Sequence, residues 1–131
     1  MRYACLVIFD GSKLDAFTPQ EKAAFDRESF EYDQRLQRGG HLVGAEALQS
    51  PGTAITVRVR NGKLSTTDGP YAETKEQLGG FVLVEARDLN EAVRLAAGIP
   101  LARLGAIEVR PVYDLGAAVA GQDRAAEGSV A

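Results

Sequence analysis

The sequence predicts a single α+β domain, and three observations lead to this prediction. Two apolar runs, 2–9 and 81–86, have the composition of buried strands. Two segments, 18–39 and 88–98, carry the start and stop signals of helices. An Asn-Gly pair between two strand-forming runs adds a hairpin. The resulting order, β-α-β-hairpin-β-α-β, predicts a ferredoxin-like fold, an antiparallel sheet with two helices on one face.

The first third of the chain is predicted to form a strand and a long helix. Neither alternate set of side chains in 2–9 is polar, so both faces of this strand should be covered. The helix begins after Thr18, which forms a capping box with Glu21, and Pro19 suits the first helical position. Gly39-Gly40 should end it. The predicted apolar stripe of this helix comprises Phe25, Tyr32 and Leu36.

The middle of the chain is predicted to form a second strand and the hairpin. HLVGAEAL (41–48) has the composition of a strand, and AITVRVR and KLSTT flank the turn Asn61-Gly62. Valine alternates with arginine over 57–60, so one face of the hairpin should meet water.

The stretch STTDGPYAETKEQLGGFVLVEA (65–86) places a turn, several acids and a lysine before a buried strand. Asp68-Gly69-Pro70 should end the preceding strand, and YAETKE (71–76) supports at most two turns of helix. Gly79-Gly80 allows the backbone to turn tightly and to approach a neighbour or a ligand closely. We therefore expect this stretch to form one edge of an interior cleft.

A second helix follows. Asp88, with Glu91 three residues later, should cap its start, and Gly98 and Pro100 should end it. Its predicted apolar stripe comprises Leu89, Ala92, Val93 and Ala96.

The chain should close with an edge strand and a tail. AIEVRPVY (106–113) alternates as a strand does, and Pro111 cannot donate a ladder hydrogen bond, which favours a sheet edge. Residues 115–131 lack periodicity, so we predict a disordered tail after a domain spanning 1–114.

The apolar surface of the predicted sheet exceeds what two helices can cover. Strands 3–9 and 81–84 are apolar on both faces, and the chain has no third amphipathic helix. A lone chain would expose a large apolar patch. A second copy, packed sheet against sheet as a two-fold homodimer, is therefore expected.

The composition limits the class of protein. The net charge of −3 argues against a protein that binds nucleic-acid backbones. No apolar run is long enough to span a bilayer and no signal peptide begins the chain, so a cytoplasmic location is expected. The one cysteine, Cys5, lies in an apolar run and should be a buried hydrophobic residue. One histidine and scattered acids predict no metal site, and no cofactor is expected.

Three motifs together resemble the DGPF branch of the YCII-related proteins. They are DGPYAETKEQLGGF (68–81), ARDLNEAVRLAAGIP (86–100) and GAIEVRPV (105–112). The resemblance covers roughly residues 1–114. The family pattern has Phe where this chain has Tyr71, which keeps the ring and adds a hydroxyl.

This resemblance implies a ferredoxin-like fold that forms a dimeric α/β barrel, with a mostly unassigned biochemical role. Related barrels include small isomerases and monooxygenases, and some DGPF genes accompany extracytoplasmic-function sigma factors. An Asp–His active pair has been proposed for the YCII branch. The only histidine here, His41, matches no family motif, so that pair is not transferred to this chain.

Two residues are catalytic candidates. Asp68 precedes Gly-Pro, where an aspartate commonly accepts backbone N–H groups and fixes a turn. Alternatively, Asp68 is a general acid or base, or a ligand-orienting carboxylate, at the mouth of the cleft. His41 starts a strand, where a histidine is more often a surface residue, but histidine titrates near neutral pH. A pair with Asp68 would make His41 a general base.

Five residues are candidates for substrate binding. Tyr71 and Lys75 would help to hold a substrate, with Lys75 directed at an anionic group. Glu73 lies in the same run of charged residues. The alternative is that Glu73 and Lys75 belong to a solvated face, as such runs usually do. Glu85 ends an apolar strand, and Arg110 could pair with it or bind a carboxylate. A structural ion pair at the dimer interface is the alternative for these two.

Two functions of different classes follow. One is a small-molecule enzyme that uses acid–base chemistry near Asp68 without metal or nucleotide. The other is a non-catalytic homodimeric binding or regulatory module, which the resemblance connects with sigma factors, and a purely structural dimer is a third alternative. The enzyme hypothesis requires Asp68 to border a pocket within hydrogen-bond reach of another titratable group. Neither the substrate nor the reaction follows from the sequence.

Overall fold

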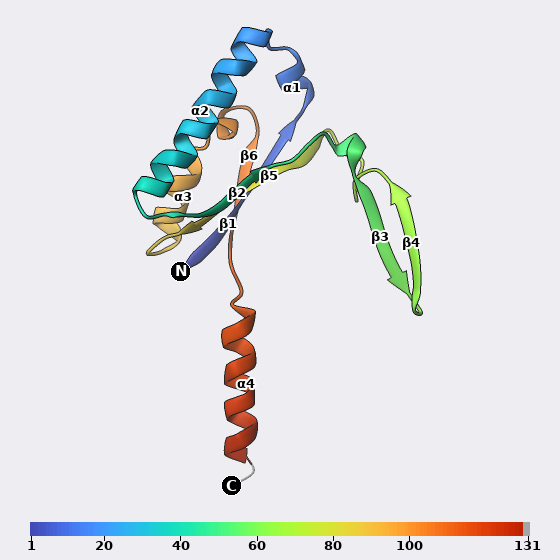
Figure 1. Ribbon diagram of the computed structural model, residues 1–131, viewed down its shortest axis with the longest axis vertical. Coiled ribbons are helices and arrows are strands. Elements are labelled where there is room, and N and C mark those ends of the chain that lie inside the picture. Colours follow the sequence, from blue (N-terminus) through green and yellow to red (C-terminus); the bar gives the residue numbers. More distant parts are fainter. Residues whose placement is uncertain (130–131) are drawn as a thin grey trace.

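The computed structural model describes residues 1–129 (Figure 1). The strands are β1 (Arg2–Asp10), β2 (Leu42–Ala47), β3 (Ile55–Arg60), β4 (Lys63–Asp68), β5 (Glu76–Glu85) and β6 (Ala106–Pro111). The α-helices are α1 (Ser12–Asp15), α2 (Pro19–Arg38), α3 (Leu89–Ala97) and α4 (Leu115–Ser129). Two short 3-10 segments are η1 (Pro51–Thr53) and η2 (Pro100–Arg103).

The main sheet has the strand order β2-β5-β1-β6, and all its neighbours are antiparallel. Helices α2 and α3 lie on the same side of this sheet (Figure 1). The predicted α+β fold, with a ferredoxin-like antiparallel sheet and two helices on one face, is therefore confirmed. Strand β6 lies at an edge of the sheet, as the proline at its end predicts.

The core lies between the sheet and its two helices. Alternate side chains of β1 (Tyr3, Cys5 and Val7) and of β5 (Val82 and Val84) are buried there. Leu36 of α2 and Ala92 and Ala96 of α3 pack against them. Burial raises the pKa of the Cys5 thiol to about 11, so the thiolate is disfavoured at neutral pH. Cys5 is thus the buried hydrophobic residue that its apolar run predicts.

Helix α2 begins and ends as predicted. The Glu21 N–H donates to Thr18 Oγ1 at 3.1 Å, and the Thr18 N–H donates to Glu21 Oε1 at 2.9 Å. Gly40, just past the C-terminus, has a φ of 78°, which glycine adopts without steric cost. The stripe faces inward, and its Tyr32 hydroxyl donates to the Leu95 carbonyl of α3 at 2.6 Å.

Helix α3 differs from its prediction in one respect. Asp88 caps it by accepting from the Glu91 N–H at 2.9 Å, as expected. Of the predicted apolar stripe, however, only Ala92 and Ala96 are buried, while Leu89 and Val93 are half exposed. Leu95 packs against the core with Ala92 and Ala96, so the inward face of the helix is rotated from the predicted stripe towards Leu95.

Strand β5 begins earlier than predicted, and residues 71–75 before it form a loop without the one or two helical turns that the sequence allowed. The Gln77 side-chain amide donates to the Ala72 carbonyl at 2.6 Å and to the Thr74 carbonyl at 2.9 Å, which fixes the preceding loop without a helix. Gly79 and Gly80 lie inside the strand rather than before it, at a register shift opposite β1. A Cβ on Gly80 would lie 2.8 Å from the Glu46 carbonyl oxygen, so the predicted close backbone approach is real.

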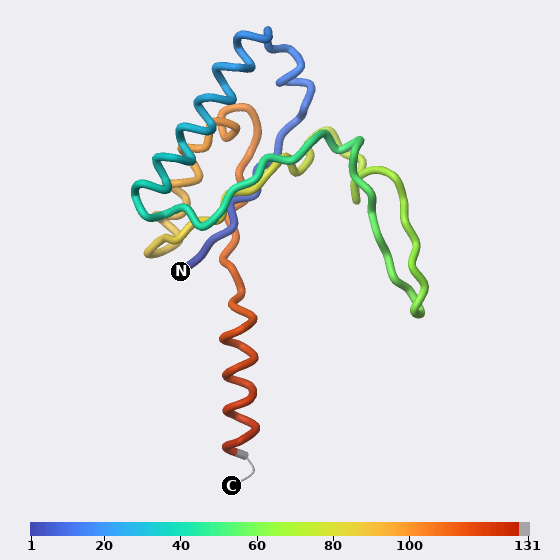
Figure 2. The backbone as a smooth tube through the Cα atoms, viewed as in Figure 1, coloured from blue at the N-terminus to red at the C-terminus, as the bar shows by residue number. Residues whose placement is uncertain are grey.

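The hairpin forms at the predicted turn. Asn61 has a φ of 52° and Gly62 a φ of 73°, the signs that a type I′ turn requires. We call residues 55–68, strands β3 and β4 with their turn, the arm. The arm extends away from the main sheet (Figures 1 and 2). Its valine face is exposed, whereas Arg58 on the other face is half-buried.

Helix α4 occupies residues for which the sequence predicts a disordered tail. The Asp114 carboxylate accepts from the Ala117 N–H at 2.9 Å, an N-cap, and the segment is rich in alanine, the strongest helix former. The helix extends away from the sheet (Figure 2). Residues 130–131 of the predicted tail lie outside the described residues, and the domain boundary at residue 114 stays a prediction.

The second face of the main sheet carries no helix. We call it the open face. Strand alternation and register place on it the apolar side chains of Ala4, Leu6, Ile8, Leu78, Phe81 and Leu83. Leu78 and Phe81 are exposed and the others are half-buried. The excess of apolar sheet surface expected from the sequence is therefore present in the single chain.

Candidate functional site

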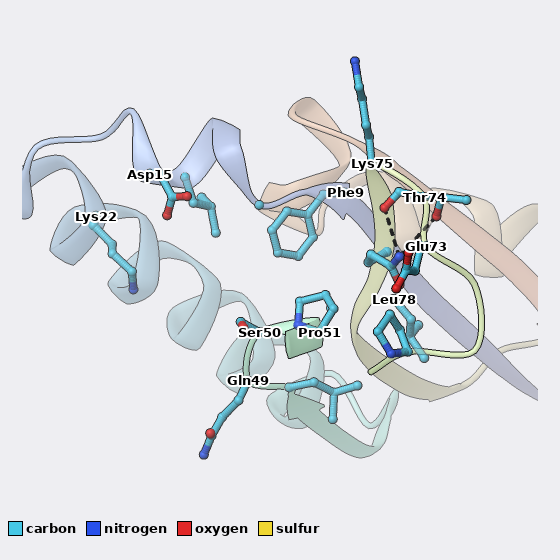
Figure 3. Close-up of a pocket in the computed structure, with 16 residues that line it drawn as sticks. Phe9, Asp15, Lys22, Gln49, Ser50, Pro51, Glu73, Thr74, Lys75 and Leu78 are labelled. Atoms are coloured by element: carbon cyan, nitrogen blue, oxygen red, sulfur yellow. Dashed lines mark hydrogen bonds between the residues drawn. The ribbon is translucent and has the colours of Figure 1, made fainter. Parts of the chain in front are cut away.

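A cavity of about 730 Å³, the main cavity, lies beside the loop that follows the arm (Figure 3). Its apolar lining comprises Phe9, Leu14, Leu48, Pro51, Pro70 and Leu78. These residues come from the end of β1, helix α1, the β2–η1 connection, the loop after β4 and the start of β5. The cleft predicted beside residues 65–86 is thus present, and apolar side chains make up much of its wall.

Charged side chains stand around the main cavity rather than meeting inside it. Lys22 forms an ion pair with Asp26 at 2.8 Å, and Asp26 is not part of the lining. Lys75 points away from the cavity (Figure 3). Its charge helps to lower the pKa of Asp10, although the main cause is the hydrogen bond from the Ser12 N–H to that carboxylate. The cavity therefore offers an apolar interior and a charged surround.

Asp68 does not line the main cavity. Its exposed carboxylate makes no hydrogen bond or ion pair with any residue of the described range 1–129. The turn after it is fixed by other groups, since the Gly69 N–H donates to the Ala54 carbonyl at 2.7 Å and Thr56 Oγ1 donates to the Gly69 carbonyl at 2.9 Å. Gly69 has a φ of 107°, which explains why glycine stands there. The predicted turn is present, but the Asp68 carboxylate does not stabilise it.

His41 and Asp68 are not brought together. His41 directly precedes β2, and its Nδ1 lies 2.9 Å from the Glu85 carbonyl oxygen at the end of β5. Asp68 belongs to the arm, which is attached beyond the other end of β2. Within one chain, the general base with an orienting carboxylate that this pair would form does not exist.

The loop of the DGPY motif is divided between the cavity and the arm. Pro70, Glu73 and Lys75 line the main cavity. Tyr71 is exposed outside it, and the Arg58 guanidinium carbon lies 5.7 Å from the centroid of the Tyr71 ring. This cation–π contact joins Tyr71 to the arm rather than to a substrate pocket.

Glu85 and Arg110 do not form the pair considered from the sequence. Strand β1 lies between β5 and β6 and separates them. Glu85 accepts from the Met1 amine at 2.8 Å, and this contact, supported by Arg2 at 3.8 Å, lowers the pKa of the Glu85 carboxyl. Arg110 instead forms an ion pair with Glu108 on its own strand.

Asp33 is a residue that sequence reasoning missed. With Ser29, one helical turn earlier on α2, it lines a second cavity of about 150 Å³ against β2, β5 and η2. Burial raises the pKa of the Asp33 carboxyl. The available signal was its position next to Tyr32 in the inward stripe, where a charged side chain is unexpected.

Asp33→Asn should remove a pH dependence of stability. Because the pKa of Asp33 is higher in the folded chain than in the unfolded one, the native state binds the extra proton, and stability falls as pH rises above about 4. We expect the difference in unfolding free energy between Asp33→Asn and wild type to favour the variant more at pH 7.5 than at pH 4. Urea unfolding at the two pH values measures it, and a difference independent of pH would contradict the assignment.

The described residues offer neither a metal site nor a membrane-spanning helix. No three His, Cys, Asp or Glu side chains within residues 1–129 lie close enough together to hold a metal ion. No helix within those residues is long and apolar enough to cross a membrane.

Comparison with known proteins identifies the family. The model of the YCII-related domain matches residues 1–116. The chain belongs to the YCII-related family. This YCII-related chain is also 34% identical over 114 residues to an uncharacterised protein of Rhizobium meliloti (strain 1021), covering 86% of this chain and 92% of that protein. The resemblance seen in the sequence is confirmed at the level of the family, and the assignment to the DGPF branch stays a prediction.

Proposed function

We propose that this YCII-related protein is a homodimeric ligand-binding module whose main cavity takes a small, largely apolar organic molecule. The observation that carries this proposal is the cavity itself, about 730 Å³ with a largely apolar lining. Small-molecule sites in proteins typically have volumes of about 300–1,000 Å³, with mostly apolar walls and a few polar groups. The polar side chains around this cavity would meet the polar end of such a ligand.

The geometry favours binding over acid–base catalysis. A general acid or base needs a titratable partner or a reacting atom within hydrogen-bond reach. Asp68 lies outside the cavity lining, and no ion pair joins two of the charged residues that line the cavity in the described chain. The enzyme hypothesis for Asp68 therefore receives no support from a single chain, and its test is part of the experiment below.

The homodimer part of the proposal follows from the open face. A patch of six apolar side chains, with Phe81 37% exposed and Leu78 44% exposed, is what a protein interface covers rather than what a monomer keeps in water. A second copy packed on this face would form the dimeric barrel that the family resemblance implies. Association with a sigma factor rests on that resemblance alone and stays a prediction, which a pull-down at physiological salt would test.

A thermal-shift screen of small aromatic and aliphatic acids, alcohols and amides tests the cavity. A ligand at one hundred times its Kd should raise the Tm of the wild type by about 5–10 °C. Leu48→Glu, which places a charge in the cavity wall, should lose most of that shift. Leu89→Glu is the matched control, because Leu48 and Leu89 are both 49% exposed but only Leu48 lines the cavity.

The same screen separates the two functions. The binding proposal expects Asp68→Asn to keep the ligand-induced shift. Loss of the shift in Asp68→Asn with retention in Leu48→Glu would move the site to Asp68 and favour the enzyme hypothesis. An equal shift in all the variants would show that the ligand binds outside the main cavity and would contradict the proposal.

A further inference from the structure

The arm presents an apolar face to solvent. Ile55, Val57 and Val59 alternate along β3 on the side that also carries Leu64, the cross-strand partner of Val59. These four side chains are 58% to 68% exposed. A two-stranded hairpin is only marginally stable by itself in water, and a contiguous apolar patch of this kind marks an interaction surface.

The arm stands beside the open face. In Figure 1 it extends from the sheet away from α2 and α3, on the side that these helices leave uncovered. Its strands pair only with each other, and its base is closed by the hydrogen bond from the Gly69 N–H to the Ala54 carbonyl, the two residues that flank it. A second copy that covers the open face therefore also comes within reach of the arm.

Charge identifies the kind of partner that the arm fits. The arm contains three basic residues, Arg58, Arg60 and Lys63, and one acid, Asp68, for a net charge of +2. The whole chain carries −3, so all the other residues together carry −5. By register the open face carries five acids, Asp10, Glu46, Glu76, Glu85 and Glu108, and two arginines, Arg2 and Arg110, so its net charge is negative. The arginines pair with Glu85 and Glu108, which leaves Asp10, Glu46 and Glu76 without an ion pair in the described chain. A basic, apolar arm and an acidic body are complementary, and a second copy of this chain supplies that body.

We propose that the arm is a clasp, which packs its apolar face on the body of a second copy of this chain. The proposal rests on the homodimer proposed above and specifies which element holds the two copies together. By two-fold symmetry each copy gives one arm and receives one. The same turn that anchors the arm contributes Pro70 to the main cavity, so a seated arm also fixes one wall of the binding site.

Sedimentation equilibrium on the full chain tests the clasp. The variant Val57→Glu/Val59→Glu places two charges on the apolar face. It should raise the dimer dissociation constant about 100-fold or more, because the clasp buries these two valines in the dimer and charges would replace them there. The control Ser65→Glu/Thr67→Glu adds the same two charges to the opposite face, since these residues pair with Arg58 and Thr56. Its dissociation constant should rise by less than about 10-fold, because these two charges stay in solvent and only offset the net charge of the arm. Leu64→Ser provides a milder single change on the apolar face, with circular dichroism as the check of folding.

Each outcome decides the proposal. Dimers of equal affinity in the wild type, the valine variant and Leu64→Ser would overturn the clasp and leave the homodimer standing. A wild type that is monomeric at all concentrations would overturn both. A basic arm could instead bind nucleic acid, so gel shifts with a random 30-base-pair DNA at physiological salt accompany the measurement. DNA binding that the valine variant loses while its dimer persists would also overturn the clasp.

Discussion

Gly105→Ala is expected to lower the free energy of unfolding by about 3 kcal/mol, near the upper end of the cost of overpacking a core. A Cβ at position 105 would lie 2.2 Å from the Ile8 carbonyl oxygen and 2.7 Å from Phe9 Cβ. Both atoms belong to β1, which is held by ladder hydrogen bonds to β5 and β6 on its two sides. Because the backbone of a central strand cannot move aside cheaply, the clash is relieved by distortion of the sheet.

Gly44→Ala is the matched control for this substitution. Gly44 lies in β2, and a Cβ built there meets no atom within 4 Å. The change should alter stability by no more than about 0.5 kcal/mol, because alanine loses less backbone freedom than glycine on folding. Urea denaturation followed by circular dichroism compares the two variants. An equal loss of unfolding free energy in the two variants would show that the predicted clash at Gly105 does not cause the destabilisation.

Gly105 also bears on the binding site, because two glycines make room for Phe9. A Cβ on Gly79 would lie 2.0 Å from Phe9 Cε1, and a Cβ on Gly105, the residue before β6, would lie 2.7 Å from Phe9 Cβ. The Phe9 ring lines the main cavity (Figure 3). The Gly-Gly pair that stands out in the sequence therefore has a specific role, since its first glycine accepts an aromatic ring that forms part of the cavity wall.

Short-range sequence signals were sufficient to predict the structure where neighbouring residues fix the backbone conformation. The capping box of Thr18 and Glu21, the cap of Asp88 and the turn at Asn61-Gly62 involve groups within three residues of one another. Such contacts form in much the same way whatever the remainder of the fold does. For this reason the element order and the α+β class followed from the sequence.

Short-range sequence signals failed to predict the structure where other hydrogen-bonding groups compete for the backbone or where distant residues determine its conformation. YAETKE contains good helix formers, but the Gln77 amide satisfies loop carbonyls and strand β5 takes up Glu76. The tail lacks an apolar stripe, yet the Asp114 cap and its alanines support a helix without one. In both segments hydrophobic periodicity carried little information, because neither packs a face against the core.

In the candidate site, too, local features could be predicted from the sequence and long-range contacts could not. The position of the cleft beside residues 65–86 could be predicted, because a turn and a close glycine approach are local features. The contacts between charged groups could not be predicted, because they depend on the order of the strands in the sheet. Placement of β1 between β5 and β6 separates Glu85 from Arg110 and leaves Glu85 to the chain's own amino terminus. Asp33 remained hidden because its burial depends on the sheet that covers its helix.

The second large effect is expected for Leu36→Ala, which should cost about 3 kcal/mol of unfolding free energy through lost burial and the cavity left behind. Leu36 is 3% exposed and packs into the core cluster between α2 and the sheet. Phe30→Ala on the same helix is the control, because Phe30 is 63% exposed and its truncation should cost less than about 0.5 kcal/mol. Both residues are apolar, so composition alone cannot separate them, whereas helical phase does: Leu36 continues the stripe of Phe25 and Tyr32, and Phe30 lies off it. Denaturant unfolding of the two variants at low protein concentration measures the difference, and a loss for Phe30→Ala as large as that for Leu36→Ala would mean that α2 presents a different face to the sheet.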